Sequence, residues 1–80
     1  MSRYYMGVEK PYFEAIEKKK KNFVLTNRPT PFRTGDWLTL YETAGRGGRT
    51  GRKTQRKIGY ILRDCPECGL AQGYCILSLI

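Results

Sequence analysis

The first clear pattern of apolar and polar positions along the chain is an amphipathic segment over residues 11–20. Tyr12, Phe13 and Ile16 are expected to share one face at helical spacing, and Pro11 suits the first helical position because its missing N–H would have no partner there. Four lysines in succession, at positions 18–21, stand where this segment ends. The pattern predicts one short helix that finishes in a run of lysines.

The rest of the chain has the pattern of short strands bounded by turn residues. The predicted strands cover residues 22–26, 37–41, 53–63 and 74–80, with residues 4–8 as a further strand before the helix. The glycine-rich segment 43–52 is predicted to be a loop. Alternation in the long strand places Ile58, Tyr60 and Leu62 on one face, and Gly59 between them indicates a β-bulge.

One helix and about five strands are too few for a sandwich or a doubly wound sheet. We therefore expect one domain over residues 1–80, of the mostly-β α+β class. The economical architecture is a small, mostly antiparallel β-barrel with the helix covering one opening. Phe13, Phe23 and Trp37 are expected to form its aromatic core.

Charge adds the first indication of function. Fifteen Lys and Arg against seven Asp and Glu give a net charge of +8. The cations are concentrated in two blocks without an acid, Lys18–Arg33 and Arg46–Lys57. Self-repulsion of this size in a compact domain is relieved by an anionic partner, and nucleic acid is the commonest such partner.

Each basic block also has a simpler explanation. Lysines near a helix C-terminus are stabilised by the helix dipole, and arginines in the loop Gly45–Arg52 can keep a hairpin connection soluble. Glycine, however, lets the backbone approach a phosphate closely, and arginine offers two parallel donors. The loop lacks the spacing of a P-loop or a dinucleotide fingerprint. The candidate nucleic-acid-binding residues are Lys20, Lys21, Arg28, Arg46, Arg49, Arg52 and Lys53, and the aromatic residues near them are Phe32, Tyr41 and Tyr60.

The cysteines and the absence of histidine bear on metal and catalytic chemistry. The segment Cys65–Gly69 resembles one half of a zinc site, but a tetrahedral site would need Cys75 together with Asp64, Glu67 or a second chain. Ordinary thiols and no metal are therefore expected. With no histidine and no serine or cysteine beside a basic partner, neither an enzyme nor a cofactor is expected.

The cysteine number also bears on location. Three cysteines favour a reducing compartment over a disulfide scaffold. The first residues lack the apolar region of a signal peptide, and the apolar run Tyr74–Ile80 is far too short to span a bilayer. We therefore expect a cytoplasmic protein without membrane contact.

Several segments in sequence resemble a known family, over roughly Tyr4 to Ile80. They are Lys10–Ile16, Thr34–Leu38, Tyr60–Leu62 and Gly69–Tyr74. Their order resembles a family of small bacterial and phage-associated proteins of unknown function within the ASCH group of PUA-like domains. The resemblance implies a PUA-like β-barrel and RNA binding. Some ASCH proteins are amidohydrolases on a modified cytidine that use a Lys, a Thr and a Glu; Lys21 matches the lysine, whereas Val24 stands at the threonine position.

The sequence thus supports three hypotheses of different classes. The first is a non-catalytic domain that binds RNA, or single-stranded DNA, through contacts to phosphates. The second is a phage- or host-related protein-interaction module that uses the same charges. The third is an ASCH-type amidohydrolase acting on a modified nucleoside.

Overall fold

The computed structural model describes residues 2–45, 48–63 and 65–80. The elements in chain order are β1 (Arg3–Glu9), α1 (Lys10–Glu17), β2 (Phe23–Thr26), β3 (Trp37–Ala44), β4 (Gly48–Arg63), the 3-10 turn η1 (Pro66–Cys68) and β5 (Cys75–Leu79). The strands form one five-stranded sheet in the order β1-β3-β4-β5-β2. Only β1 and β3 pair in parallel among these described strands. The expected mostly-β α+β fold with five strands and one α-helix is confirmed.

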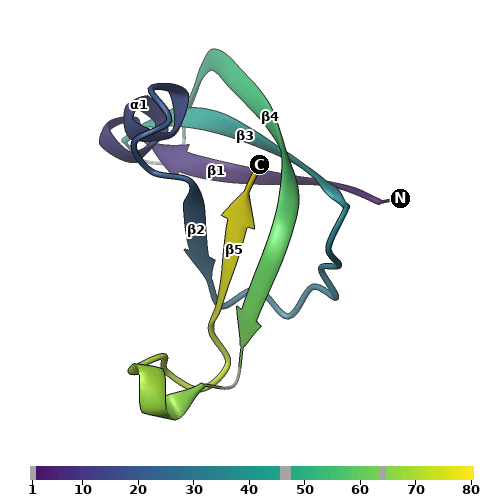
Figure 1. Cartoon of the computed structure of the whole chain (residues 1–80). Coiled ribbons are helices and arrows are strands. Elements are labelled where there is room, and N and C mark those ends of the chain that lie inside the picture. The colour runs from purple at the N-terminus through teal and green to yellow at the C-terminus, as the bar shows by residue number, and fades with distance from the viewer. Residues whose placement is uncertain (1, 46–47, 64) are drawn as a thin grey trace.

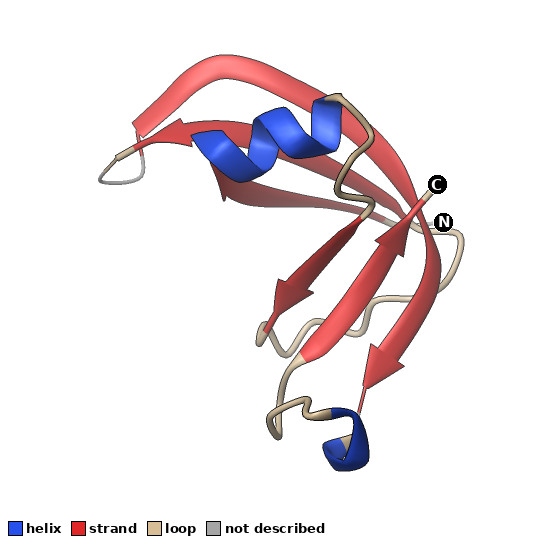
Figure 2. Ribbon diagram, turned by 60° about the vertical axis from the view of Figure 1, so that its left-hand side comes forward, coloured by secondary structure: helices blue, strands red, loops and turns tan. Residues whose placement is uncertain are grey.

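The sheet is curled into a half-barrel because the long strand β4 belongs to two parts of it (Figure 1). Its first part pairs with β3 as far as Lys57, and its second part, from Ile58, pairs with β5. Figure 2 shows the resulting arch, with α1 packed on the inner side against β1 and β3. The strands β1 and β2 are the two ends of the sheet and each leaves one edge unpaired by a strand.

The core lies between the helix and the inner side of the sheet. Phe13 and Ile16 of α1 are 0 % exposed and pack with Leu38 and Leu40 of β3. Tyr12, expected on the same face, is 53 % exposed, so that part of the prediction is wrong. The core prediction is correct for Phe13 but wrong for Phe23, which is 47 % exposed. Alternation along β2 turns Val24 inward instead.

Trp37 and Phe32 also differ from the expectation. Trp37 is only half-buried, so it is not a core residue. Phe32 is 4 % exposed and meets the ring of Tyr4 edge-on, with the ring centroids 4.9 Å apart. Phe32 therefore supplies the buried aromatic side chain that the sequence had assigned to Phe23, and it is unavailable for stacking on a base.

The predicted loop over residues 43–52 is wrong, because β3 continues to Ala44 and β4 already begins at Gly48. The glycines suggested a loop, but two of them, Gly48 and Gly51, lie in β4. Gly51 has a φ of +94° and lies where the register between β3 and β4 shifts, between the Tyr41↔Lys53 and Thr43↔Arg49 pairs. A left-handed residue in the strand accommodates this bulge. Arg46 lies outside the described residues.

The bulge expected at Gly59 is confirmed by a register shift between Ile58 and Tyr60. The shift changes the faces of the strand, so Ile58 is 0 % exposed whereas Tyr60 is 65 % exposed. The prediction that these two residues share a face is therefore wrong. A side chain at Gly59 would also approach Ile80 Cγ2 to 2.9 Å.

Two further expectations change. Helix α1 ends at Glu17, so the lysines at 18–21 follow the helix and do not form its last turn. Cys65 and Cys68 form a disulfide because the η1 turn brings their Cα atoms to 5.4 Å, so the expectation of ordinary thiols is wrong for this pair. Among the described residues, no helix has the length and apolar character needed to cross a bilayer.

Candidate nucleic-acid interface

Alternation along β4 divides the second basic block between the two sides of the sheet. Arg52 and Arg56 point inward, toward the helix, whereas Arg49, Lys53 and Lys57 point outward. Residues that are adjacent in the sequence therefore have different roles. The inward pair contacts the protein itself, and the outward set remains available to a partner.

The inward arginines are engaged in structural contacts. Arg56 donates to Asn22 Oδ1 at 3.0 Å and to the carbonyl oxygen of Leu79 at 3.2 Å, which ties the end of β5 to the segment after the helix. Arg52 Nη1 lies 3.2 Å from Glu42 Oε2, and its guanidinium lies 5.1 Å from the Phe13 ring centroid.

Glu42 explains why Arg52 is needed at this position. Its carboxylate is 2 % exposed and accepts a hydrogen bond of 2.6 Å from Thr50 Oγ1. A buried carboxylate needs a nearby cation and hydrogen-bond donors to offset its lost hydration. Arg52 and Thr50 supply both from the facing strand, so the first role of Arg52 is within the fold.

The outward side chains of β1, β3 and β4 form a surface that we call the outer face. The register Arg3↔Trp37↔Lys57 sets one row across the three strands, and Tyr5↔Thr39↔Gln55 sets the next. The third row is Gly7↔Tyr41↔Lys53. The outer face comprises Arg3, Tyr5, Trp37, Thr39, Tyr41, Arg49, Lys53, Gln55 and Lys57.

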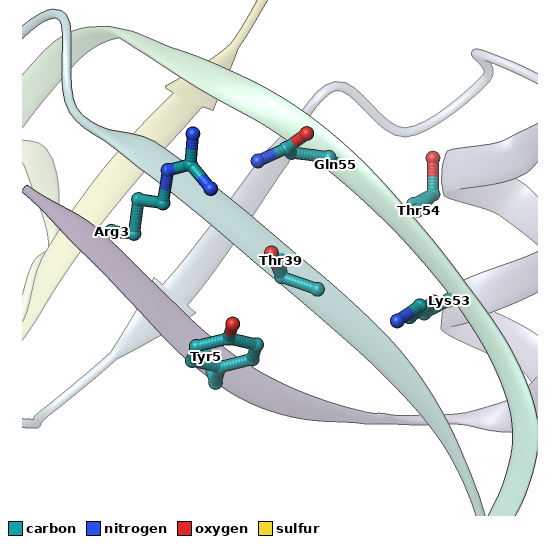
Figure 3. A pocket seen from close by; sticks show the side chains of 6 residues that line it. All are labelled: Arg3, Tyr5, Thr39, Lys53, Thr54 and Gln55. Carbon is teal, nitrogen blue, oxygen red and sulfur yellow. The ribbon is translucent and has the colours of Figure 1, made fainter.

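A shallow pocket of about 350 Å³ lies in the middle of the outer face. Figure 3 shows Arg3 and Tyr5 on β1, Thr39 on β3, and Lys53 and Gln55 on β4 around it. The lining combines cations, hydroxyl groups and an amide with one exposed aromatic ring. These groups can donate to phosphate oxygens and base edges.

Cations and aromatic rings of the outer face contact each other. The guanidinium of Arg49 lies 4.2 Å from the Tyr41 ring centroid, and Lys57 Nζ lies 5.7 Å from that of Trp37. Gly7 leaves room for the Tyr41 ring, because a Cβ at Gly7 would be only 3.0 Å from Tyr41 Cε2. The face therefore presents flat rings beside positive charge, which is the combination that binds single-stranded nucleic acid.

Of the seven residues predicted from sequence, the six that the structure describes do not form one cluster. Arg49 and Lys53 lie together on the outer face, and Arg52 lies on the other side of the sheet. Lys20 is exposed in the turn after the helix. Arg28 donates from its guanidinium to the carbonyl oxygen of Tyr5 on β1, at 2.8 Å.

Lys21 lies in a separate groove between β1, α1 and β2. Its Nζ is 4.7 Å from the Tyr12 ring centroid and 5.3 Å from that of Phe23. Partial burial lowers the pKa of Lys21 from its ordinary value of 10.5, because the charged form loses hydration. This groove has a cavity volume of about 420 Å³ and is lined mainly by apolar residues of β1 and β2.

Sequence reasoning missed most of the outer face. Arg3, Tyr5, Trp37 and Lys57 were not selected, and Thr39 and Gln55 were not considered. A signal was present in the alternation of β3, which places Trp37, Thr39 and Tyr41 on the side opposite Leu38 and Leu40. Which cations lie beside them depends on the strand pairing, which the sequence alone does not specify.

The turn with the paired cysteines lies away from this face, at the far end of β4 and β5 (Figure 1). The ligand atoms of Cys65, Glu67 and Cys68 lie within 4.8 Å of one another. The sulfur atoms of Cys65 and Cys68 are joined in the disulfide, so they are not thiolate ligands for a metal in this form. Cys75 is a free, buried thiol in β5.

Comparison with known proteins places the chain in a family. A search of curated proteins gives no match. The family model described as a domain of unknown function, DUF3850, matches residues 5–79. This agrees with the resemblance to a family of unknown function. The match begins at Tyr5, the third residue of β1, and includes every later strand. The chain therefore belongs to the DUF3850 family.

Proposed function

We propose that the outer face binds nucleic acid, with single-stranded RNA as the preferred ligand. The observation that carries the proposal is the arrangement of four cations, Arg3, Arg49, Lys53 and Lys57, around three aromatic rings on one open side of the sheet. Charge alone is compatible with any anionic partner. Rings beside the charges favour an unpaired strand, whose bases are free to stack.

The cations and the rings have separate tasks in this proposal. Lys53 and Arg3 neutralise phosphates, which supplies affinity that is independent of the base sequence. Tyr5 is 58 % exposed and offers its ring to a base, while Thr39 and Gln55 offer hydrogen bonds to base edges or a ribose hydroxyl. No covalent chemistry is required of any of these residues.

We further propose that the domain is PUA-like, in the ASCH group, as its motif order suggests. The curled five-stranded sheet with a helix on its inner side is compatible with such a barrel. An amidohydrolase function has weaker support. Lys21 is available in the groove, but Val24 is 4 % exposed and carries no hydroxyl group.

The test is fluorescence anisotropy with labelled single-stranded RNA, double-stranded RNA and single-stranded DNA of equal length, over a range of salt. We expect tightest binding to single-stranded RNA. If about four phosphates are neutralised, log K falls against log salt with a slope of roughly −0.7 × 4.

A matched pair of variants assigns the binding to the face. Lys53→Gln should reduce the salt slope by roughly 0.7, because one phosphate contact is lost. Lys18→Gln removes the same charge from an exposed position after the helix and should leave the slope nearly unchanged. Equal effects of the two variants would show that net charge, and not the outer face, produces the binding.

A further inference from the structure

The edge strand β2 has backbone groups that no neighbouring strand uses. In an antiparallel pair, alternate residues direct both N–H and C=O toward the partner strand. The N–H of Leu79 donates to the carbonyl oxygen of Asn22 at 2.8 Å, and the register continues through Val24↔Leu77. Phe23 and Leu25 therefore direct their N–H and C=O groups away from β5, toward the groove.

The other edge of the sheet, on β1, is partly covered by a side chain. On β1, Arg28 donates to the carbonyl oxygen of Tyr5 and so covers one backbone group of that edge. On β2, residues Phe23–Thr26 contain neither proline nor a charge, the two common devices that prevent strand addition. Among the described residues, no side chain hydrogen-bonds to the backbone of Phe23 or Leu25.

Both sides of this edge are apolar. On the groove side, Met6, Val8 and Tyr12 line the cavity of about 420 Å³ together with Phe23 and Leu25. On the outer side, the pairing aligns two rows across β2, β5 and β4. These rows are Phe23, Ser78 and Tyr60, and then Leu25, Ile76 and Leu62.

The ends of these rows are open surface, whereas Ser78, Ile76 and Leu62 are partly buried. Leu25 is 54 % exposed and Tyr60 is 65 % exposed. An added strand would find apolar contacts for the side chains on both of its faces. A contiguous apolar patch on a strongly charged domain indicates a protein-interaction site.

Charge specifies what kind of segment fits. Lys21 stands at the entrance of β2, over the rings of Tyr12 and Phe23. Glu9 also lines the groove, yet no ion pair of Lys21 is found within residues 2–45, 48–63 and 65–80. A second copy of this chain would bring a further net charge of +8, whereas an acidic segment is attracted.

We propose that the β2 edge binds an extended segment of a partner protein by β-strand addition, with alternating apolar residues and an acid that pairs with Lys21. Main-chain hydrogen bonds to Phe23 and Leu25 supply affinity, and the acid and apolar side chains supply specificity. The site is separate from the outer face. Its success or failure is therefore independent of nucleic-acid binding.

The test begins with short random peptides displayed on phage and selected on the immobilised full-length chain. We expect enriched peptides that alternate apolar residues and carry Asp or Glu. With such a peptide bound, hydrogen exchange at the Phe23 and Leu25 amides should slow, while the Val24 amide, already bonded to β5, should change little. Failure to enrich such peptides, or unchanged exchange at both amides, would overturn the proposal.

A proline substitution tests the edge directly. Leu25→Pro removes an N–H that points toward the groove without removing a β2–β5 hydrogen bond, so the fold should persist. Binding of the selected peptide should weaken by about tenfold or more, since a main-chain bond is lost and the ring obstructs the added strand. Leu25→Val keeps the N–H and is the control.

Two further readouts, neither of which uses Leu25→Pro, make the outcome decisive if that variant unfolds. Lys21→Gln should weaken binding of acidic peptides by several-fold or more and should affect neutral peptides much less. Size-exclusion chromatography with light scattering determines the oligomeric state of the wild type. A dimer in which hydrogen exchange at the Phe23 and Leu25 amides is already slow would mean that a second copy occupies the edge, which contradicts the proposal.

Discussion

At the scale of single residues, the most consequential contact is the pairing of the buried Glu42 with Arg52, whose side chain is half-exposed. Glu42 is 2 % exposed and is held by Arg52 and Thr50 across the β3–β4 pairing. Removing the cation beside a buried carboxylate is destabilising, because the remaining charge keeps its desolvation penalty. The pair therefore fixes Arg52 in a structural role.

We expect Arg52→Gln to lower the free energy of unfolding by about 1–3 kcal/mol, since Glu42 would keep only the Thr50 hydrogen bond. Arg49→Gln, three residues away on the outer face, should change it by no more than about 0.5 kcal/mol. Urea denaturation followed by circular dichroism measures both. Equal destabilisation by the two substitutions would contradict the division of the arginines between the two sides of the sheet.

Lys21 gives a prediction about pH. Because burial lowers the pKa of Lys21 below 10.5, the folded chain binds fewer protons than the unfolded chain between the lowered pKa and 10.5. The free energy of unfolding should therefore increase as pH rises through this window and decrease as pH falls through it. Urea denaturation at several pH values in the wild type and in Lys21→Gln isolates this contribution, since the two proteins differ only in this side chain. Identical pH dependence of the two proteins would show that the folded chain does not desolvate this amine.

At the scale of elements, glycines within β4 determine which side chains share a face. Gly51 lies at the register shift between β3 and β4, and Gly59 lies at the shift between β4 and β5. The first sets the register that places Arg49 opposite Thr43 and Lys53 opposite Tyr41. The second turns Tyr60 outward while Ile58 stays in the core.

We expect Gly51→Ala to destabilise the protein by about 1 kcal/mol, because a φ of +94° is strained for any residue with a side chain although the space around it is open. Gly48→Ala is the control. Its φ is not positive and its Cβ would make an ordinary contact of 3.5 Å, so its effect should be neutral or slightly stabilising. Thermal unfolding of both variants distinguishes backbone strain at Gly51 from a destabilising effect that any added side chain would have in this part of β4.

Most elements could be predicted from sequence to within three residues, because the helix and strands show clear periodicity, but β4 begins at Gly48, five residues before the predicted strand. Which residues of β2 and β4 share a face could not be predicted in the same way. Alternation was counted straight through Gly59, although a bulge there had been recognised, so Tyr60 was placed with Ile58. Phe23 was chosen for the core on size alone, whereas the pairing of Val24 with Leu77 decides which residue of β2 is buried.

At the scale of the whole molecule, the curled sheet separates two surfaces of different chemistry. The outer face over β1, β3 and β4 is cationic and aromatic. The surface over β4, β5 and β2 is apolar and ends in an open strand edge. The two proposals assign a nucleic acid to the first surface and a segment of a partner protein to the second.

Composition predicts an anionic partner but does not locate a site. The net charge of +8 favours an anionic ligand, and two of the candidate residues, Arg49 and Lys53, lie on the outer face. Arg3 and Trp37 were missed because they become neighbours of Lys57 only through the parallel pairing of β1 with β3 and the antiparallel pairing of β3 with β4. Long-range pairing of this kind is not encoded in any local motif.

The most direct test of the central claim uses the single tryptophan of the chain, Trp37, which lies on the outer face beside Lys57. Unlabelled single-stranded RNA is titrated into the protein while tryptophan fluorescence is recorded, in parallel with anisotropy of labelled RNA. We expect the fluorescence to be quenched with the same midpoint as the anisotropy change, and both midpoints to move together as salt rises. RNA binding that leaves the fluorescence of Trp37 unchanged would place the nucleic acid elsewhere on the molecule and contradict the account.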